Sequence, residues 1–165
     1  MVLTKEEFIE SLKNEVRILL HLTTKIDRAK LDYRPTAKQR STIELLRYMT
    51  FMGPFLIRSI KAGAFDPPAW NAAAAVADAS DFDAVVAQIG RQSEDCPQLL
   101  AGFSEDDLRA EIEMFGQKTT RGSALVNTVL SAYAAYRTQL FLYLKACGRE
   151  ELNTMNLWVG VDGPM

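Results

Sequence analysis

Apolar residues recur at intervals of three and four in four long segments of the sequence, a spacing typical of amphipathic α-helices. These segments span approximately residues 4–26, 41–62, 80–101 and 120–147. At 165 residues the chain has the length of one domain with a continuous core. The pattern predicts one all-α domain over residues 1–165, a four-helix bundle with a long connection between the second and third helices. An irregular tail is expected over 149–165.

Local signals mark the starts of the first two helices. Thr4 is followed three residues later by Glu7, and Ser41 is followed in the same way by Glu44. Each pair predicts a capping box, in which side chain and backbone bond each other at the helix N-terminus. Within the second helix, Gly53-Pro54 predicts a kink, because proline lacks an N–H group and clashes with the preceding turn.

The segments between the helices are less regular. Asp66-Pro67-Pro68 predicts an extended stretch, and residues 71–75, Asn followed by four Ala, favour a helical turn. Residues 108–115 alternate with period two, which indicates a short extended piece. Residues 116–122 have the composition of a loop, and Trp158 is expected to anchor the tail against the bundle.

Composition narrows the classes of function. The net charge of −2 gives the chain no overall bias toward polyanions. The longest apolar window, residues 49–57, is too short to span a bilayer, and the N-terminal residues lack the pattern of a signal peptide. Cys96 and Cys147 are too few for a disulfide scaffold. We therefore expect a cytoplasmic protein with reduced thiols and no membrane partner.

Charge is unevenly distributed along the chain. Residues 25–47 hold seven basic side chains, and residues 78–113 hold ten acidic ones. A basic patch for nucleic acid is one interpretation, but Tyr33 is the single aromatic residue of the basic segment before the helix and offers little stacking surface. The sequence favours the other interpretation, in which the two segments face each other within the chain or across a homodimer.

The sequence lacks the residues that several common metal-binding and phosphate-binding motifs require. The chain has one histidine, His21, and it contains no Glu-x-x-His, His-Glu-x-x-His or Cys-x-x-Cys motif. The glycines around residues 116–122 are in the wrong order for a phosphate-binding loop. His21 lies within an apolar run of the first helix and is interpreted as a structural residue.

Two segments resemble the DinB-like superfamily of four-helix bundles. The first is residues 33–49, with an aromatic-x-Pro loop, the Ser41 cap and a Glu-Leu-Leu-x-Tyr sequence. The second is residues 119–140, which contains Tyr136-Arg137-Thr-Gln139 on the fourth helix. The resemblance implies the DinB-like fold. It also implies a metal-dependent enzyme, because active members include transferases and isomerases that use small thiols such as mycothiol or bacillithiol.

The same resemblance assigns positions to the family's metal ligands. One ligand comes from the second helix and two, spaced four residues apart, come from the fourth, and here these positions hold Tyr48, Ala132 and Tyr136. An alanine methyl group cannot coordinate an ion, and a neutral phenol is a poor ligand. We therefore predict no cofactor and a degenerate metal site. The alternative is a zinc or nickel ion held by shifted ligands such as Glu44 or Gln139.

A pocket between the second and fourth helices is the candidate functional site. Its predicted residues are Glu44, Tyr48, Met52, Tyr133, Tyr136, Arg137 and Gln139. Tyr48 and Tyr136 could equally be core tyrosines whose hydroxyls are paired with neighbours. Arg137 and Gln139 could grip a ligand carboxylate, or tether the helix to the inter-helix connection or to Glu44.

Three functions remain open at this point. The chain could be a metal-free module that binds a small molecule or another protein, and a homodimer is predicted. It could be a metal- or thiol-dependent transferase or hydrolase of the DinB-like superfamily. It could also be a structural partner whose surface matters more than its pocket. The sequence favours the first.

Overall fold

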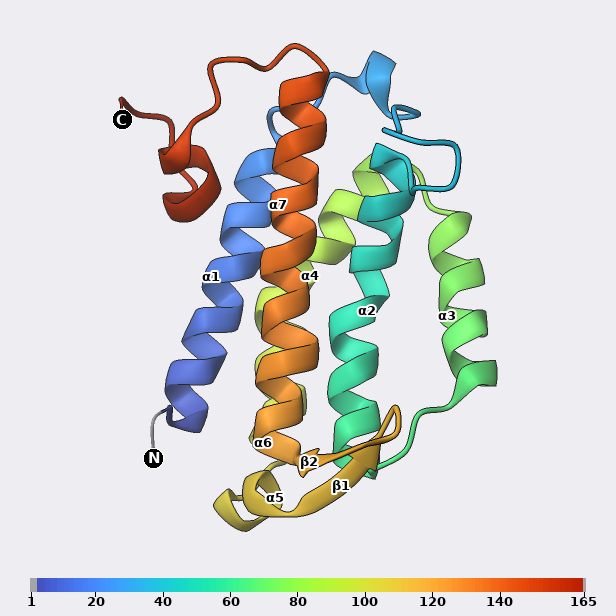
Figure 1. The fold of residues 1–165 in the computed structure, drawn as a ribbon, viewed down its shortest axis with the longest axis vertical. Helices are drawn as coiled ribbons and strands as arrows, with labels where there is room; N and C mark the ends of the chain where they lie inside the picture. The colour runs from blue at the N-terminus through green and yellow to red at the C-terminus, as the bar shows by residue number, and fades with distance from the viewer. Residues whose placement is uncertain (1–2, 165) are drawn as a thin grey trace.

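Four long helices form a bundle in the computed structural model, which describes residues 3–164. They are α1 Lys5–Thr23, α2 Thr42–Ala62, α4 Phe82–Ala101 and α7 Ser131–Ala146, and they run side by side in Figure 1. Helix α7 is extended at its N-terminal end by α6 Arg121–Ala124 and the π-helical turn η2 Leu125–Leu130. The predicted all-α bundle with four principal helices is confirmed.

The bundle core is made of the apolar stripes that define the helices in the sequence. Each long helix contributes side chains that are almost entirely buried, among them Leu12, Leu19, Leu46, Ile57, Ile89, Val129 and Leu140. Both predicted capping boxes are present: the backbone N–H of Thr4 donates to Glu7 over 2.7 Å, and that of Ser41 donates to Glu44 over 2.7 Å. Such caps satisfy backbone donors that helix geometry leaves free.

Helix α2 continues through Pro54 because another helix supplies the missing hydrogen bond. Without an N–H at Pro54, the carbonyl of Thr50 loses its helical donor. The Gln92 amide of α4 donates to the Thr50 carbonyl over 2.7 Å and to the Met49 carbonyl over 2.8 Å. The Tyr133 hydroxyl of α7 then donates to the Gln92 carbonyl oxygen. This Gln92 network joins three helices at the centre of the core.

Gly53 makes room for the Tyr133 ring in this network. A Cβ atom at position 53 would stand 2.1 Å from the Tyr133 hydroxyl oxygen and 2.6 Å from a ring carbon. No side chain fits there, so the Gly53-Pro54 pair serves the approach of Tyr133.

The connection between α2 and α4 contains a fifth substantial helix, α3 Pro67–Asp78. The expected extended stretch at Asp66-Pro67-Pro68 is wrong. Asp66 is the N-cap and accepts a hydrogen bond from the Ala69 N–H over 3.0 Å, and the prolines occupy the first helical turn. Proline suits that turn because its fixed φ is helical and its missing donor would be free anyway. Helix α3 lies alongside α2, outside the bundle (Figure 1).

A short β-hairpin closes one end of the bundle. Helix α5 Glu105–Arg109 leads into β1 Glu111–Met114, which pairs antiparallel with β2 Gln117–Thr120. The extended piece predicted within 108–115 is present, whereas the loop expected over 116–122 contains the second strand. Phe115 and Gly116 form the two-residue turn with φ of 53° and 73°, as tight hairpins require.

The tail packs on α1, but Trp158 is not its anchor. Trp158 is 64% exposed, whereas Leu152 and Asn156 are buried. The Asn156 amide lies 3.1 Å from His21 Nε2 and donates to Asp162 over 2.9 Å. The tail includes the π-helical turn η3 Met155–Val159, and a 3₁₀ turn, η1 Arg28–Lys30, follows α1. Buried Leu152 and the polar contacts of Asn156 hold this segment, and the exposed Trp158 ring adds a contact with the Arg137 guanidinium, whose Cζ lies 5.3 Å from its centroid.

Within residues 3–164, no helix combines the length and the apolar character that crossing a membrane requires.

The basic and acidic segments of the sequence meet within one chain, where the Arg28 guanidinium donates to both carboxylate oxygens of Asp83 over 3.0 and 2.5 Å. The two segments therefore neutralise each other at this point without a second chain.

Candidate ligand-binding cleft

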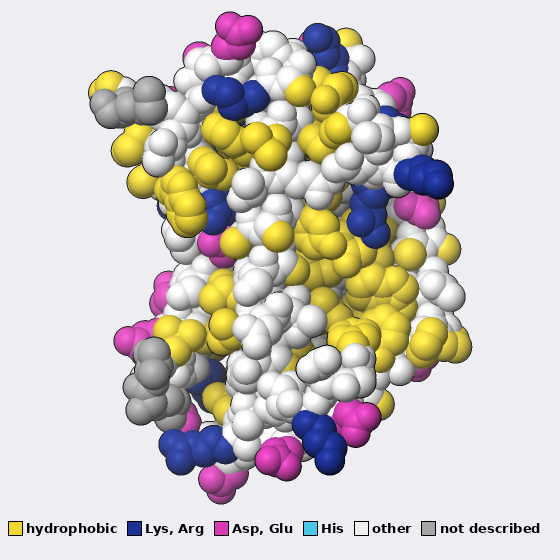
Figure 2. All heavy atoms as spheres, in the orientation of Figure 1, with side chains coloured by type: hydrophobic (Ala, Val, Ile, Leu, Met, Phe, Trp, Pro, Cys, Tyr) yellow, Lys and Arg dark blue, Asp and Glu magenta, His cyan; other side chains and the backbone are white. Residues whose placement is uncertain are grey.

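A cleft of about 640 Å³ opens between α2, α3, the hairpin turn and the η2–α7 helix. Its apolar and aromatic walls are Tyr48, Met52, Leu56, Phe65, Trp70, Phe115, Ala132, Ala135 and Tyr136, and its polar residues are Asn127, Thr128 and Ser131. Figure 2 shows the corresponding hydrophobic surface between α7 and α3. Tyr48, Ala132 and Tyr136, which the family resemblance singled out, therefore line one space. We call it the aromatic cleft.

The aromatic rings of the cleft contact one another edge to face. The Tyr48 ring centroid lies 5.1 Å from that of Tyr136 and 5.8 Å from that of Trp70. Phe65 lies 5.4 Å from Trp70 and 5.4 Å from Phe115. Tilted and edge-to-face contacts at these distances are favourable for rings with negative faces and positive edges. The rings thus support one another and leave a pocket with a mostly apolar wall.

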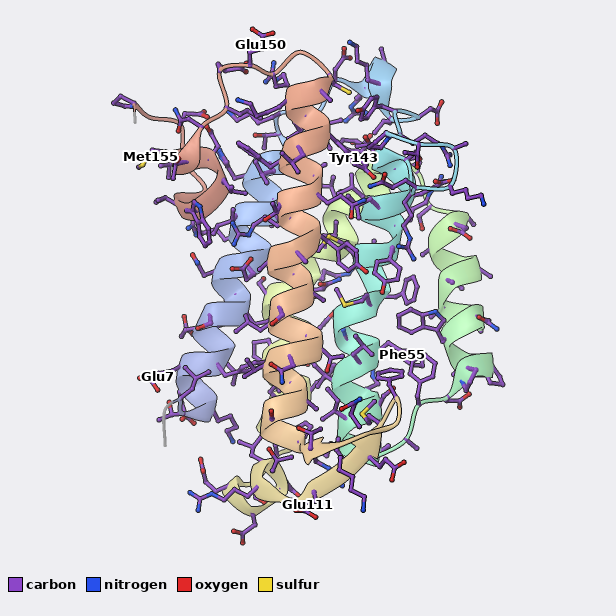
Figure 3. All side chains as sticks on the ribbon, viewed as in Figure 1. Glu7, Phe55, Glu111, Tyr143, Glu150 and Met155 are labelled. Atoms are coloured by element: carbon purple, nitrogen blue, oxygen red, sulfur yellow. The ribbon has the colours of Figure 1, made fainter. Side chains whose placement is uncertain are left out.

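Helix α3 and the hairpin are what turn this surface into a cleft. Phe55 points from α2 toward α3, where its ring centroid lies 5.1 Å from that of Trp70 (Figure 3). Phe115 is 61% exposed at the hairpin turn and reaches the cleft through Phe65. Aromatic side chains thus form part of the contact between the bundle and these added elements.

The π-helical turn η2 and the residue that follows it, Ser131, supply the polar residues. In a π-turn the backbone is wider than in an α-helix, and such turns occur often at functional sites. The Ser131 hydroxyl donates to the Val126 carbonyl over 2.9 Å, and the Thr128 hydroxyl donates to the Ala124 carbonyl. Both hydroxyl oxygens keep acceptor capacity, and the exposed Asn127 amide has donors and an acceptor.

The chemistry of the cleft does not suit a divalent metal ion. Burial, followed by the neighbouring Tyr136 hydroxyl, raises the pKa of the Tyr48 phenol above its ordinary value of 10.0. Phenolate, the form that would bind a metal, is therefore disfavoured at neutral pH. Ala132 contributes a methyl group, and within residues 3–164 no group of three His, Cys, Asp or Glu side chains is placed to hold a metal.

Glu44 lies beside the aromatic cleft, in an adjoining groove, and its oxygens are already engaged. One accepts from the Ser41 N–H over 2.7 Å and the other from the Arg34 guanidinium over 3.1 Å. The hydrogen bond from the Ser41 backbone is the main cause that lowers the pKa of Glu44. Glu44 is thus a helix cap held by an arginine.

Three predicted pocket residues lie away from the cleft. Tyr133 is fully buried in the Gln92 network. Arg137 is buried on another face of α7, where it pairs with both oxygens of Glu15 on α1 over 2.6 and 3.1 Å and donates to the Leu157 carbonyl. It grips a carboxylate of the chain itself, so neither a ligand nor Glu44 is its partner.

Gln139 is the third of these residues. Its amide donates to the Tyr143 hydroxyl over 2.6 Å, and that hydroxyl donates to the Arg40 carbonyl over 2.8 Å. Gln139 therefore supports the connection that precedes α2. Helical spacing alone does not explain these placements, because Tyr133 and Gln139 lie only about 60° around α7 from Tyr136. Their hydrogen-bond partners, Gln92 and Tyr143, direct them away from the cleft.

The two thiols and the histidine lie outside the cleft. Burial raises the pKa of Cys96 to about 12, which keeps this thiol protonated beside Tyr133. Burial also raises the pKa of the half-buried Cys147. For His21, burial is the main cause that lowers the pKa, and the ring serves the contact with the tail.

The sequence predictions missed Phe65, Trp70 and Phe115 as cleft residues. A signal was present in the first two, since Asp66 followed by two prolines is a helix start. An amphipathic α3 with Trp70 would then have required a partner surface. No pattern in the sequence predicted the π-helical turn, or the hairpin turn that brings Phe115 beside Phe65.

Comparisons with known proteins give one informative finding. No protein-family model matches the chain, and no curated protein matches it. The structure is similar to the crystal structure, at 2.30 Å resolution, of YjoA, a DinB-like protein from Bacillus subtilis. The TM-score is 0.66 at 21% sequence identity, over 88% of this chain and 94% of the other. The chain therefore has the DinB-like fold, as its sequence motifs predicted.

Proposed function

We propose that this protein binds a small, largely apolar molecule in the aromatic cleft and does so without a metal ion. The observation that carries the proposal is the lining itself. Five aromatic residues, Tyr48, Phe65, Trp70, Phe115 and Tyr136, surround a space of about 640 Å³ with polar groups on one wall. Pockets of this size, apolar with a few placed polar groups, are typical binding sites for small molecules.

The cleft offers binding groups and little that could catalyse a reaction. Neutral phenols, an amide and hydroxyls can orient a ligand, whereas general acid–base catalysis at neutral pH needs a group that titrates there. The raised pKa of Tyr48 moves that phenol further from this range. These properties support a binding role. The alternative to be tested is a metal-dependent DinB-like enzyme.

A matched pair of substitutions tests the cleft. The uncharged dye N-phenyl-1-naphthylamine serves as the probe in a Trp158→Phe background, which leaves Trp70 as the single tryptophan. We expect bound dye to receive excitation energy from Trp70. Ala135→Phe fills the cleft from an exposed position without adding a tryptophan, and it should weaken binding at least tenfold, about 1.4 kcal/mol.

Leu142→Phe provides the control, because Leu142 is also exposed on α7 but does not line the cleft. It should leave dye binding unchanged. Equal binding by both variants, or no binding by the parent protein, would overturn the proposal.

Metal content provides the second test. Protein purified without a histidine tag should contain zinc and nickel far below one equivalent by plasma mass spectrometry. One equivalent of zinc or nickel per chain that is lost in the Tyr48→Phe variant would overturn the proposal. It would favour the metal-dependent transferase or hydrolase instead. The homodimer expected from the sequence stays a prediction, which light scattering checks against the chain mass of 18.4 kDa.

A further inference from the structure

We propose that the ligand of the aromatic cleft is an anion and that Arg40 recognises its charged group. This inference rests on the proposed binding function and deepens it. The chemical class is an aromatic carboxylate, or a related sulfonate or phosphate, whose ring system occupies the cleft while its charge lies at the rim.

Arg40 stands where the cleft continues into a smaller groove. This groove, of about 300 Å³, is lined by Arg40, Glu44, Tyr48, Phe51, Trp70, Ala74 and Asp78. It shares Tyr48 and Trp70 with the aromatic cleft. A molecule whose rings contact Tyr48 in the cleft is therefore within reach of groups in the groove. In Figure 2 a basic side chain borders the hydrophobic surface between α7 and α3.

The Arg40 guanidinium is held by stacking. Its Cζ atom lies 4.0 Å from the centroid of the Tyr48 ring. Stacking uses the face of the guanidinium and leaves its N–H groups directed sideways, where they can donate two parallel hydrogen bonds to a carboxylate. Tyr48 thus fixes the cation and at the same time forms the wall of the cleft.

Two neighbouring arginines, Arg34 and Arg47, are engaged within the chain, whereas Arg40 is available. Arg34 pairs with Glu44 over 3.1 Å, and Arg47 donates to the Ser80 carbonyl over 2.9 Å. Among the ion pairs and side-chain hydrogen bonds of residues 3–164, none uses the Arg40 guanidinium, although Glu44 and Asp78 line the same groove. A cation stacked on a cleft tyrosine and left without a carboxylate partner fits an incoming anion.

Asp78 provides an internal check on the sign of the ligand charge. It lies in the last turn of α3 and lines the groove with Arg40. Its carboxylate repels an anion and attracts a cation or the ammonium group of a zwitterion. Asp78→Asn should therefore strengthen the binding of an anion by about twofold, because two charges near the surface interact weakly.

Two dyes with the same rings separate charge from shape. The anionic probe is 1-anilinonaphthalene-8-sulfonate, and the neutral one is N-phenyl-1-naphthylamine, which lacks the sulfonate. The folded protein should bind the anionic dye about tenfold more tightly at low salt. Arg40→Gln should remove this preference and leave the affinity for the neutral dye within twofold. Arg40→Lys should retain part of it, since it keeps the charge but loses the planar fork.

Arg91→Gln is the matched control. Arg91 is exposed on α4 and does not line the cleft or the groove, so its removal lowers the net charge by the same amount without touching the site. It should leave the preference for the anionic dye unchanged. Thermal unfolding of each variant confirms that the dyes report on folded protein.

The outcomes separate the two proposals. If neither dye shows binding that Ala135→Phe blocks, the binding function fails, and the anion inference fails with it. If the neutral dye binds in the cleft but the sulfonate adds no affinity, or if Arg91→Gln removes as much preference as Arg40→Gln, the anion inference alone is overturned. A weaker affinity for the anionic dye in Asp78→Asn also overturns it.

Discussion

Tyr133 and Tyr136 lie three residues apart on α7, yet they belong to two different regions of the molecule. Tyr133 is fully buried in the Gln92 network, and its hydroxyl donates to the side chain that repairs the backbone at Pro54. Tyr136 is half-buried in the wall of the aromatic cleft, where its ring contacts Tyr48. The first region is closed and filled, and the second is open and lined with apolar rings.

The difference shows how one helix serves structure and binding at once. A step of three residues leaves two side chains about 60° apart around an α-helix, so the two phenols start from neighbouring directions. Tyr133 turns inward to Gln92 of α4, and Tyr136 contacts Tyr48 of α2. On the closed side, a missing hydrogen bond would leave polar groups buried without a partner, which is costly. On the open side, water or a ligand can satisfy the same group. A tyrosine on α7 therefore indicates a binding site only where its side chain faces an open cleft and is not enclosed by other side chains.

Gly53→Ala gives the largest expected effect on the closed side. The new Cβ would stand 2.1 Å from the Tyr133 hydroxyl oxygen, so the core must shift to accept it. We expect a loss of about 3 kcal/mol in the free energy of unfolding, measured with urea. Gly90→Ala is the control: its Cβ would meet Leu20 at 3.9 Å, and alanine should stabilise this helix by about 0.5–1 kcal/mol. Equal effects of the two changes would refute the close approach of Tyr133.

Gln92→Leu tests the repair of helix α2. It leaves the Thr50 carbonyl and the Tyr133 hydroxyl without their partner in the core, and we expect a cost of about 2–3 kcal/mol. Pro54→Ala restores the N–H that the Thr50 carbonyl lacks. In the Gln92→Leu background it should recover about 1 kcal/mol, and in the parent it should recover less. Additive effects in the double-mutant cycle would show that Gln92 does not compensate for Pro54.

The tyrosine pair itself gives the smallest and most direct comparison. Tyr133→Phe leaves the Gln92 carbonyl oxygen unsatisfied in the core and should cost about 1–2 kcal/mol. Tyr136→Phe removes a hydroxyl at the open cleft, where water replaces it, and should cost less than about 0.5 kcal/mol. Dye binding should change in the reverse order, with Tyr136→Phe having the larger effect. A greater loss of stability from Tyr136→Phe would assign this residue to the closed core.

Much of the architecture could be predicted from the sequence because its causes are local. Apolar spacing located the four long helices, and Thr4 and Ser41 located two of their starts, since a capping box involves residues only three apart. The alternation near residue 111 located a strand. The motifs around Tyr48 and Tyr136 pointed to the DinB-like fold and to three residues of the cleft, Tyr48, Ala132 and Tyr136.

Other features required contacts between distant residues. Asp66-Pro67-Pro68 is compatible with an extended stretch and with a helix start, and it forms the start of α3, whose Trp70 packs on α2. Arg137 and Gln139 sit near Tyr136 in the sequence, but their partners, Glu15 and Tyr143, draw them away from the cleft.

By itself, the sequence determined the four long helices, the capping boxes of two of them and the bundle, because these follow from periodicity and from hydrogen bonds between near neighbours. Only the tertiary structure decided which tyrosine is part of the core and which lines a pocket. It placed Arg40 over Tyr48 and left that guanidinium without a carboxylate partner among the described residues. Burial and pairing depend on what the rest of the chain brings to each side of a helix, and a linear pattern does not contain that information.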